Sequence, residues 1–463
     1  MPENMKRFPD VLTLLTSFMV LFTVLTWVIP AGEFERQQFK NKEVVVPGTY
    51  HQVEQNAQGV MDFVTAPIKG FVAAADIIGF VFLVAGAFGI VQKTGAIEAF
   101  LERVIAFGVA RPQFKMAILP LLIALFSLGG ATFGMAEEVL VFVMLTIPLA
   151  HALGYDTVVG VAIPFVGAGV GFAGAFINPF TVGIAQGIAQ LPPGSGFNYR
   201  LVCWVVFTLV AILFICRYAS RIEQDPSRSV VHGTPSKWDR VPEPETLTMT
   251  ANRVAVLALL VGALALLVYG VQEWGWYIEE IAGLFVGMGL LASVIGRLSA
   301  QDTVKAFTQG AADVVMAALI IGFSRGLLVI AEQGHIIDTI LHSLAGLAEG
   351  LAPAASVLVM FVFQSFLNFF VPSGSGQAAL TMPLMAPLSD LLQVERQVAV
   401  LSFQFGDGIS NLVIPTSGIT MGLLELAGIP YDRWFKFCFP LVLILSVVAC
   451  VLLVLPVTVF HWS

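Results

Sequence analysis

Long apolar stretches, separated by two polar ones, dominate the chain. Apolar runs recur, for example at 11–30, 252–269 and 437–457. A helix that crosses a hydrocarbon layer of roughly 30 Å needs about 20 mostly apolar residues, and these runs have that length. The pattern therefore predicts an all-α polytopic membrane protein embedded in a lipid bilayer.

The two polar stretches, 31–66 and 218–250, predict loops on opposite sides of the membrane. Basic residues are enriched on the cytoplasmic side of membrane proteins. The second stretch with its flanks holds Arg217, Arg221, Arg228, Lys237, Arg240 and Arg253, and the first holds Arg36, Lys40 and Lys42. We therefore expect 218–250 in the cytoplasm, 31–66 outside, and a retained first helix with a cytoplasmic N-terminus.

The two halves of the chain match each other at an offset of 239 residues. At this offset "VQKTGAIEAFL" meets "IAEQGHIIDTI", so that Gly95 meets Gly334, and Pro148 meets Pro387. The first half follows an outside loop, and the second follows a cytoplasmic loop plus a helix pair, so the two repeats should have inverted topology. The inverted topology requires an odd number of membrane crossings between residues 66 and 217. The number is odd only if the short segment 97–110 crosses the membrane.

The predicted organisation follows from these features. Residues 1–66 hold the first transmembrane helix and the external loop, 67–217 the first repeat, 218–250 the cytoplasmic loop, 251–300 the connecting helix pair, and 301–463 the second repeat. Each repeat should contain a re-entrant helical hairpin followed by a broken transmembrane helix.

The hairpins and breaks are predicted from small and helix-breaking residues. The stretches "GGATFGMAEE" and "FFVPSGSGQ" enter apolar hairpins, and glycine- and proline-rich segments follow at 167–179 and 406–418. Proline removes a helix hydrogen bond and glycine weakens a helix, so each segment should break. Freed backbone groups are tolerated at membrane depth only inside protein or along a watery cavity. We therefore expect a transport site near the membrane midplane.

Composition agrees with this class and excludes others. Of the 463 residues, 57% are hydrophobic and 12% are charged, and the mean hydropathy of +0.87 is far from that of soluble domains. The net charge of -8 comes with no basic arm, so a nucleic-acid partner has no support. The four cysteines lie in apolar runs without metal-ligand spacing, which predicts neither a metal site nor a disulfide framework.

Polar side chains near the predicted hairpin tips and helix breaks are candidates for binding. For the substrate they are Thr132, Glu137, Glu138, Asn178, Thr181, Arg325, Ser373, Ser375, Gln377, Asn411, Thr416 and Ser417. For a coupling ion, Na⁺ or H⁺, they are Asp407, Ser410 and Asn411. No catalytic residue and no further cofactor is expected.

Glu137 and Glu138 are adjacent carboxylates in an otherwise apolar run. An ionised carboxylate at membrane depth costs about 2.5 to 3.5 kcal/mol, so a buried pair indicates a use. Neighbouring helical residues point about 100° apart, so one should face the cavity while the other contacts a hydroxyl or a cation. The alternative is a wet hairpin mouth in which both carboxylates are solvated.

Asp407 lies between Gly406 and Gly408, and exposed carbonyls at these glycines could join its carboxylate around a small cation. The alternative for Asp407 is an ion pair with Arg325, which also lies in an apolar run and could instead bind a substrate carboxylate. The sequence Ser-Gly-Ser at 373–375 fits either a cradle of hydroxyls and amides or a plain turn.

Three stretches are shared with a known family: "RFPDVLTLLTSFMVLFTVLTWVIPAGEFER", "GAFGIVQKTGAIE" and "GGATFGMAEE". The chain resembles, over essentially its whole length, the YfcC-type branch of the anaerobic C4-dicarboxylate carrier family. The resemblance implies a homodimer of inverted repeats with re-entrant hairpins and split helices, as in the ion transporter superfamily, in a bacterial inner membrane. Members of the branch are described as candidate basic amino acid antiporters similar to arginine/ornithine exchangers, and relatives carry C4-dicarboxylates or short-chain fatty acids.

The superfamily has a Ser-Asn-Thr signature at its hairpin tips. This chain matches the signature only in part, through Ser410, Asn411 and Thr416 and through Asn178 and Thr181. The resemblance therefore carries ion-site residues over only as approximations.

Charge among the candidates favours one substrate class. Glu137, Glu138 and Asp407 stand against Arg325 alone. An acidic site in a membrane favours a cationic or zwitterionic solute. We therefore expect secondary active transport of a basic amino acid such as arginine or ornithine, by exchange or ion coupling. The alternative substrate is a C4-dicarboxylate or another carboxylate.

Two other classes of membrane protein fit parts of the sequence. An intramembrane aspartyl protease pairs two buried aspartates to activate water, and Asp156 and Asp407 are the candidates here. Gln404 replaces a glycine of the usual protease pattern, so we do not expect this activity. A passive channel also permits inverted repeats with broken helices, and flux that saturates and exchanges one solute for another would exclude it.

Overall fold

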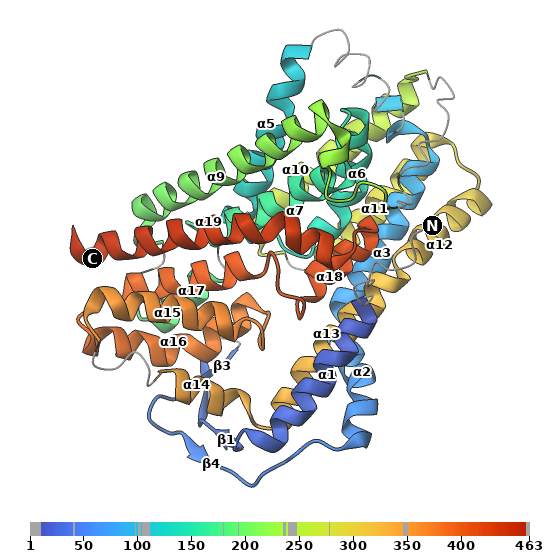
Figure 1. The fold of residues 1–463 in the computed structure, drawn as a ribbon. Coiled ribbons are helices and arrows are strands. Elements are labelled where there is room, and N and C mark those ends of the chain that lie inside the picture. Colours follow the sequence, from blue (N-terminus) through green and yellow to red (C-terminus); the bar gives the residue numbers. More distant parts are fainter. Residues whose placement is uncertain are drawn as a thin grey trace.

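The computed structural model describes residues 11–39, 42–97, 99–100, 103, 112–178, 180–192, 194–234, 238, 248–276, 278–345 and 351–459. Helices make up most of it (Figure 1). The first half contains α1 (Val11–Val28), α2 (Val60–Ala73), α3 (Ala75–Lys93), α5 (Pro112–Phe133), α6 (Val139–Ala152), α7 (Thr157–Ala173), α8 (Val182–Ile188) and α9 (Phe197–Gln224). The second half, after the 3-10 helix η1 (Pro226–Arg228), contains α10 (Ala251–Trp274), α11 (Ile278–Gly296), α12 (Ala300–Asp313), α13 (Val315–Gln333), α14 (Ile337–Ala345), α15 (Pro353–Leu367), α16 (Gly374–Leu391), α17 (Arg396–Ser410), α18 (Gly418–Ala427) and α19 (Tyr431–Thr458).

Two small antiparallel sheets lie in the polar stretch between α1 and α2, where the sequence pattern predicts only a loop. The strand β1 (Gly32–Glu33) pairs with β4 (His51–Gln52), and β2 (Arg36–Phe39) pairs with β3 (Lys42–Val45). α2 also begins inside this stretch. The carboxylate of its residue Asp62 accepts a hydrogen bond from the Gly59 amide at 2.9 Å and so satisfies the helix start.

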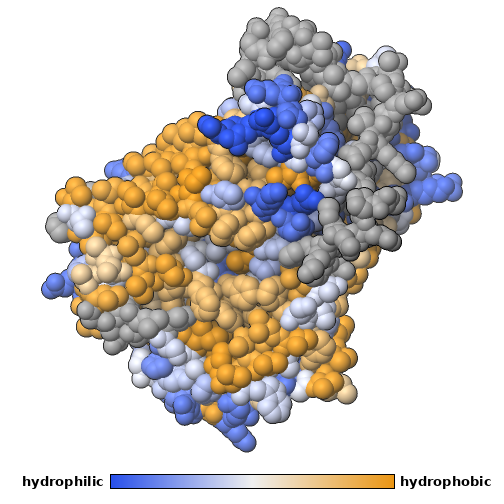
Figure 2. Space-filling view, in the orientation of Figure 1, coloured by the Kyte–Doolittle hydropathy of each residue, from blue (hydrophilic) through white to orange (hydrophobic). Residues whose placement is uncertain are grey.

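Four of the described helices, α3, α9, α11 and α19, are long and apolar enough to cross a membrane. α12 and α13 meet at a bend of 42° and together would form a fifth span. Figure 2 shows apolar side chains over the side that carries α9, α15 and α19, and hydrophilic ones at the end that carries β1 and β4. The chain is therefore a multi-pass helical membrane protein, as its apolar runs predict.

The helices form two packed groups. In the first, which we term the arm bundle (α1–α3 and α10–α13), α2 packs against α13, and α3 packs against α11 and α12. In the second, the core bundle (α5–α9 and α15–α19), α7 packs against α5, α6 and α9, and α17 packs against α15, α16 and α19. The bundles meet at α18, which follows α17 but packs mainly against α13 of the arm bundle and less against α6, and they meet again where α3 contacts α6.

Glycine allows the close approach of α5 and α7 in the core bundle. A Cβ on Gly171 would collide with the backbone of Ser127, and a Cβ on Gly130 would collide with the backbone of Ala168. Without side chains at these positions the two backbones touch, as is common where helices pack in membranes. The first hairpin is thereby held tightly against α7.

Helix lengths recur in the same order in the two halves. α2 and α12 each have 14 residues, α3 and α13 each have 19, and α9 and α19 each have 28. Pro148 and Pro387 lie inside α6 and α16, respectively. Other pairs at the same offset differ, since α5 and α15 have 22 and 15 residues and α7 and α17 have 17 and 15. The predicted inverted topology requires segment 97–110 to cross the membrane. This segment lies outside the described residues except at 97, 99–100 and 103.

α7 and α17 run in opposite directions along the core bundle. Arg200, near the start of α9, donates to Gln397 at the start of α17 at 3.3 Å. Tyr218, near the end of α9, donates to Asp156 at the start of α7 at 2.6 Å. A helix of 28 residues is about 42 Å long, so α7 and α17 begin at opposite ends of the molecule.

Each glycine- and proline-rich segment breaks, but only near its end. Residues 174–181 separate α7 from α8, and 411–417 separate α17 from α18. Gly406 and Gly408 remain helical, and the Gly406 carbonyl accepts a hydrogen bond from Ser410 Oγ at 2.6 Å, so the expectation that Gly406 exposes its carbonyl is wrong. They allow close packing instead, because a Cβ on Gly408 would lie 2.5 Å from Ala173 Cα.

Candidate functional site

A cavity of about 350 Å³ lies between the arm bundle and the core bundle. Its arm side is formed by the start of α3, the turn between α10 and α11, and the middle of α13. Its core side is formed by the turn between α5 and α6, the start of α16, and the breaks after α7 and α17. Helix ends and breaks therefore present backbone groups and polar side chains to one space.

Most of the predicted substrate residues line this cavity. They are Glu137, Glu138, Thr181, Arg325, Ser373, Ser375, Asn411, Thr416 and Ser417. Thr132, Asn178 and Gln377 do not line it, and neither do Asp407 and Ser410 of the predicted ion site. Residues from both halves of the chain and from both bundles thus meet at one place.

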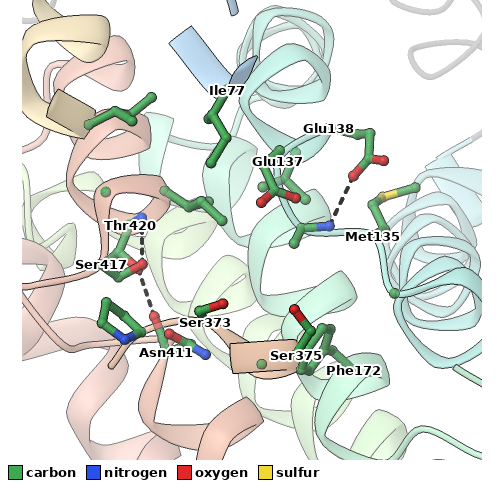
Figure 3. Close-up of a pocket in the computed structure, with 18 of the residues that line it drawn as sticks. Ile77, Met135, Glu137, Glu138, Phe172, Ser373, Ser375, Asn411, Ser417 and Thr420 are labelled. Carbon is green, nitrogen blue, oxygen red and sulfur yellow. Dashed lines mark hydrogen bonds between the residues drawn. The ribbon is translucent and has the colours of Figure 1, made fainter. Parts of the chain in front are cut away.

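Glu137 and Glu138 lie in the turn between α5 and α6 and have different surroundings. Glu138 Oε2 accepts a hydrogen bond from the Ala136 amide at 3.0 Å. Glu137 points into the space that Ser373 and Ser417 border on the other side (Figure 3). Both residues border the cavity. We expected a hydroxyl or a cation as the partner of the second carboxylate, but in the structure its partner is a backbone amide.

A third carboxylate of the cavity, Asp76, was not among the predicted candidates. It lies in the first turn of α3, directly after the junction with α2 at Ala74, and it lines the cavity together with Glu137. The signal was present in the sequence, because Asp76 is a lone carboxylate in the apolar run "FVAAADIIGFVF". It was missed because neither glycine nor proline marks the junction of α2 and α3.

Ser373 and Ser417 cap two helices that start at the cavity. Ser373 Oγ accepts from the Gly376 amide at 3.3 Å at the start of α16, and Ser417 Oγ accepts from the Thr420 amide at 3.3 Å at the start of α18. Helix N-termini carry a partial positive charge, so both attract anionic groups. Ser373 is therefore a helix cap and a cavity residue at once (Figure 3).

Arg325, in the middle of α13, brings a full positive charge to the cavity. It forms no ion pair with any carboxylate of the described residues, and its Nε is buried without a hydrogen-bond partner among them. The alternative of an ion pair between Asp407 and Arg325 is therefore wrong. The guanidinium is left to face the cavity.

Asp407 lies fully buried in α17, one layer beneath the cavity wall. Its Oδ1 accepts from Asn411 Nδ2 at 2.9 Å, and its Oδ2 has no hydrogen-bond partner among the described residues. A Cβ on Gly374 would lie 2.8 Å from this Oδ2 and 2.7 Å from Thr181 Cγ2. The carboxylate thus reaches the start of α16 beside the break after α7.

Asn368 joins the three residues of the predicted ion site and was not predicted. Its Nδ2 donates to the Asp407 carbonyl at 3.1 Å and to Ser410 Oγ at 2.8 Å. The Asp407 carbonyl also accepts from Asn411 at 3.0 Å. Asn368 follows α15 directly, so the second hairpin is tied to the end of α17 next to the break.

The three predicted residues outside the cavity shape the hairpins. Asn178 Oδ1 accepts from the amides of Phe180 and Thr181 at 2.9 and 3.3 Å and holds the break after α7. Gln377 donates to Gln364 Oε1 at 2.7 Å between α15 and α16. Thr132 Oγ1 donates to the Leu128 carbonyl of its own helix at 2.7 Å. The contacts of these three side chains are therefore structural.

A second cavity of about 610 Å³ adjoins the first and shares Arg325, Ser373 and Ser375 with it. The wall that β1, β2 and α14 contribute to this second cavity carries charged side chains that contact each other. Arg36 in β2 pairs with Asp338 in α14 at 2.9 Å, and His335 Nδ1 lies 2.6 Å from Glu33 Oε1 in β1. The sheets therefore border a vestibule that leads to Arg325.

The positions of Asp156 and Asp407 exclude a catalytic pair of aspartates. Asp156 caps the start of α7, where its Oδ1 accepts from the Val159 amide at 2.9 Å. Asp407 lies beside the other end of α7, because its neighbour Gly408 packs on Ala173. The 17 residues of α7 span about 25 Å, so the two carboxylates cannot activate one water. The protease alternative is therefore wrong.

Comparison with known proteins identifies relatives over the whole chain. The family described as C4-dicarboxylate anaerobic carrier (DcuC) matches residues 8–458. A protein of Escherichia coli (strain K12) named YfcC, a candidate basic amino acid antiporter, is 36% identical over 94% of this chain and 93% of its own length. An uncharacterized protein of Haemophilus influenzae is 29% identical over 98% of both chains. The YdaH transporter of Alcanivorax borkumensis aligns over 98% of this chain and 99% of its own with 15% identity and a TM-score of 0.45.

Proposed function

The chain belongs to the C4-dicarboxylate anaerobic carrier (DcuC) family and is therefore a membrane transporter and not an enzyme, and we propose that it exchanges basic amino acids such as arginine and ornithine by alternating access. The name of the Escherichia coli relative, 36% identical to this chain, supports the substrate class. The charges of the cavity support it independently.

The observation that carries the proposal is the separation of charge in the cavity. Arg325 lines it from α13 and forms no ion pair with a carboxylate of the described residues, and the starts of α16 and α18 add positive potential. Glu137 faces it from the turn between α5 and α6. A basic amino acid has a carboxylate for the positive side and a cationic side chain for the acidic side. Unpaired charges at membrane depth persist where they serve a substrate.

Alternating access would use inverted repeats with re-entrant hairpins. The recurring helix lengths, the pairing of α2 with α13 and of α3 with α12, and the opposite directions of α7 and α17 support this arrangement. The hairpins would be α5–α6 and α15–α16, whose turns line the cavity. The proposal places the protein in the inner membrane as a homodimer, with the N-terminus and residues 218–250 in the cytoplasm.

Asp407, Ser410 and Asn411 are proposed to couple transport to Na⁺ or H⁺. The support is that Oδ2 of the buried Asp407 and Oγ1 of Thr181, both near the start of α16, have no hydrogen-bond partner among the described residues. A buried carboxylate without a partner is costly unless a cation or a proton neutralises it. Thr181 lines the cavity, so this position communicates with the substrate space.

Counterflow in proteoliposomes tests the substrate class. Vesicles are loaded with unlabelled ornithine and given labelled arginine, and a parallel set is loaded with succinate and given labelled malate. Accumulation of arginine above its outside concentration, in the first set only, is the expected result. It would also exclude a passive channel, because counterflow requires a carrier.

A C4-dicarboxylate is the second candidate, and one observation favours it. Arg325 and the two helix starts form a positive region large enough to hold a second carboxylate. In that case malate would accumulate in the second set, Arg325→Gln would abolish its transport, and Glu137→Gln would leave it intact. Lys305→Gln, an exposed charge on α12 away from the cavities, is the control.

A further inference from the structure

The cavity carries like charges on its arm side and on its core side. At the acidic side, Asp76 on α3 of the arm bundle lines the same cavity as Glu137 and Glu138 at the turn between α5 and α6 of the core bundle. The two elements are neighbours, since α3 contacts α6. Moving the bundles together would bring these carboxylates closer.

The same holds with opposite sign at the other side of the cavity. Arg325 on α13 belongs to the arm bundle, whereas the positive helix starts at Ser373 and Ser417 belong to the core bundle. α13 packs against α18, so these charges also approach each other when the bundles close. Both junctions are therefore repulsive unless a solute lies between the charges.

Unsatisfied polar groups show that the cavity is built for a polar solute. Ser324, Thr181 and Thr416 are 5%, 2% and 2% exposed, and their hydroxyls have no hydrogen-bond partner among the described residues. All three line the cavity. Buried hydroxyls are almost always hydrogen-bonded, so a bound solute would satisfy them.

We propose that Asp76 makes exchange obligatory, because the bundles close only around a solute that is cationic at the acidic side and anionic at the positive side. This inference rests on the proposed function and extends it to the coupling of the two directions of transport. Closing removes water from the gap, and like charges then repel more strongly. A cationic side chain between Asp76 and Glu137 converts this repulsion into attraction at the moment of closing.

Asp76 is thus a positioning residue, and its loss uncouples the two directions of transport. Asp76→Asn removes the arm-side charge of the acidic junction while Glu137 remains to bind the substrate. The empty carrier can then close and return. Net efflux without a solute on the opposite side becomes possible, whereas the wild type moves substrate only in exchange.

Efflux from proteoliposomes loaded with labelled arginine measures this directly. Rates are recorded with and without unlabelled arginine outside, in buffer alkaline enough to ionise the carboxylates. The quantity compared is the efflux rate with unlabelled arginine outside divided by the rate without it. This ratio is expected to be high in the wild type. In Asp76→Asn it falls by about tenfold, the order expected for removing one like-charge contact across a partly hydrated gap.

Two variants keep the outcome decisive. Asp76→Glu preserves the charge and should keep the high ratio. Asp313→Asn removes a carboxylate at the junction of α12 and α13, which lines none of the described cavities, and should also keep it. An unchanged ratio in Asp76→Asn, or an equal fall in either of these variants, overturns the inference. Absence of arginine exchange in the wild type itself would instead overturn the proposed function.

Discussion

Individual charged residues of this chain differ in what their surroundings allow. Glu138 has a backbone amide, and Arg36 and Asp338 have each other. Glu137 and Arg325 line the cavity, and Arg325 forms no ion pair with a carboxylate of the described residues. Because a charge at membrane depth is costly, unpaired ones indicate positions that a solute or an ion completes.

Neutralising the two glutamates should have different effects. Glu137→Gln should raise KM for arginine about tenfold or more, because a hydrogen bond to a charged group contributes about 1.5 to 3 kcal/mol. Glu138→Gln should mainly lower stability, by about 0.5 to 1 kcal/mol, since it removes an anion at the start of α6. Initial uptake rates and the yield of monodisperse protein separate the two effects. Unchanged uptake in both single variants and in the double variant would contradict the assignment.

Asp407→Asn should abolish the dependence of uptake on an imposed Na⁺ or pH gradient. The substitution keeps the acceptor for Asn411 and removes only the charge and one anionic oxygen, so the fold should persist. Uptake is measured in proteoliposomes with each gradient imposed separately. Asp432→Asn, at the start of α19, is the matched control. Gradient dependence that survives in Asp407→Asn would count against the ion-coupling role.

Single elements owe their positions to glycine and proline more than to apolar periodicity. The breaks after α7 and α17 let polar groups reach the cavity from helices that are otherwise buried. Glycine on the buried faces has a second use, because it brings α5 and α7 into backbone contact. Helix packing in membranes depends on such close contact, since apolar side chains gain little by leaving lipid.

A pair of glycine substitutions tests this packing. Gly171→Ala places a methyl group against the Ser127 backbone and should destabilise the protein by about 1 to 3 kcal/mol. Gly79→Ala in α3 meets no atom within 4 Å and should be neutral or stabilise by about 0.5 to 1 kcal/mol. Thermal unfolding of the detergent-solubilised variants measures both. Equal unfolding temperatures would mean that α5 and α7 tolerate separation.

The whole molecule consists of two bundles with the substrate cavity between them. The charged sheets and α14 border a vestibule on one side of this cavity. Because the cavity lies at the boundary of the two bundles, their relative position controls whether it is open or closed. Movement of one bundle against the other would therefore provide alternating access.

A reversible cross-link between the bundles should stop transport. A Cβ at Gly418 would lie 3.6 Å from Ile321 Cβ, close to the mean Cβ separation of about 3.8 Å in disulfides. Oxidation of the double variant Ile321→Cys with Gly418→Cys should therefore join α13 to α18 and abolish arginine exchange, and reductant should restore it.

The control cross-link lies within the arm bundle. A Cβ at Gly296 would lie 3.2 Å from Thr94 Cβ, so Thr94→Cys with Gly296→Cys joins two elements that should move together. Exchange should survive oxidation of this pair. Exchange that also survives in the pair between α13 and α18 would show that the bundles need not move relative to each other.

The sequence by itself determined the class and most of the elements. Apolar length predicts membrane helices, because hydrocarbon thickness sets how many residues a span needs. Glycine and proline predict the two breaks, because they weaken the local hydrogen-bond ladder. The polar residues beside these features include most of those that line the cavity. These properties are local, and a single stretch of sequence contains them.

Only the tertiary structure decided which of these side chains share a space and which have partners. It brought Asp76 and Glu137 to one cavity, left Arg325 without an ion pair among the described residues, and put Asp156 and Asp407 at opposite ends of α7. It also formed two small sheets between α1 and α2 where only a loop was expected. Pairing between residues far apart along the chain depends on how helices pack, and neither periodicity nor composition contains that information.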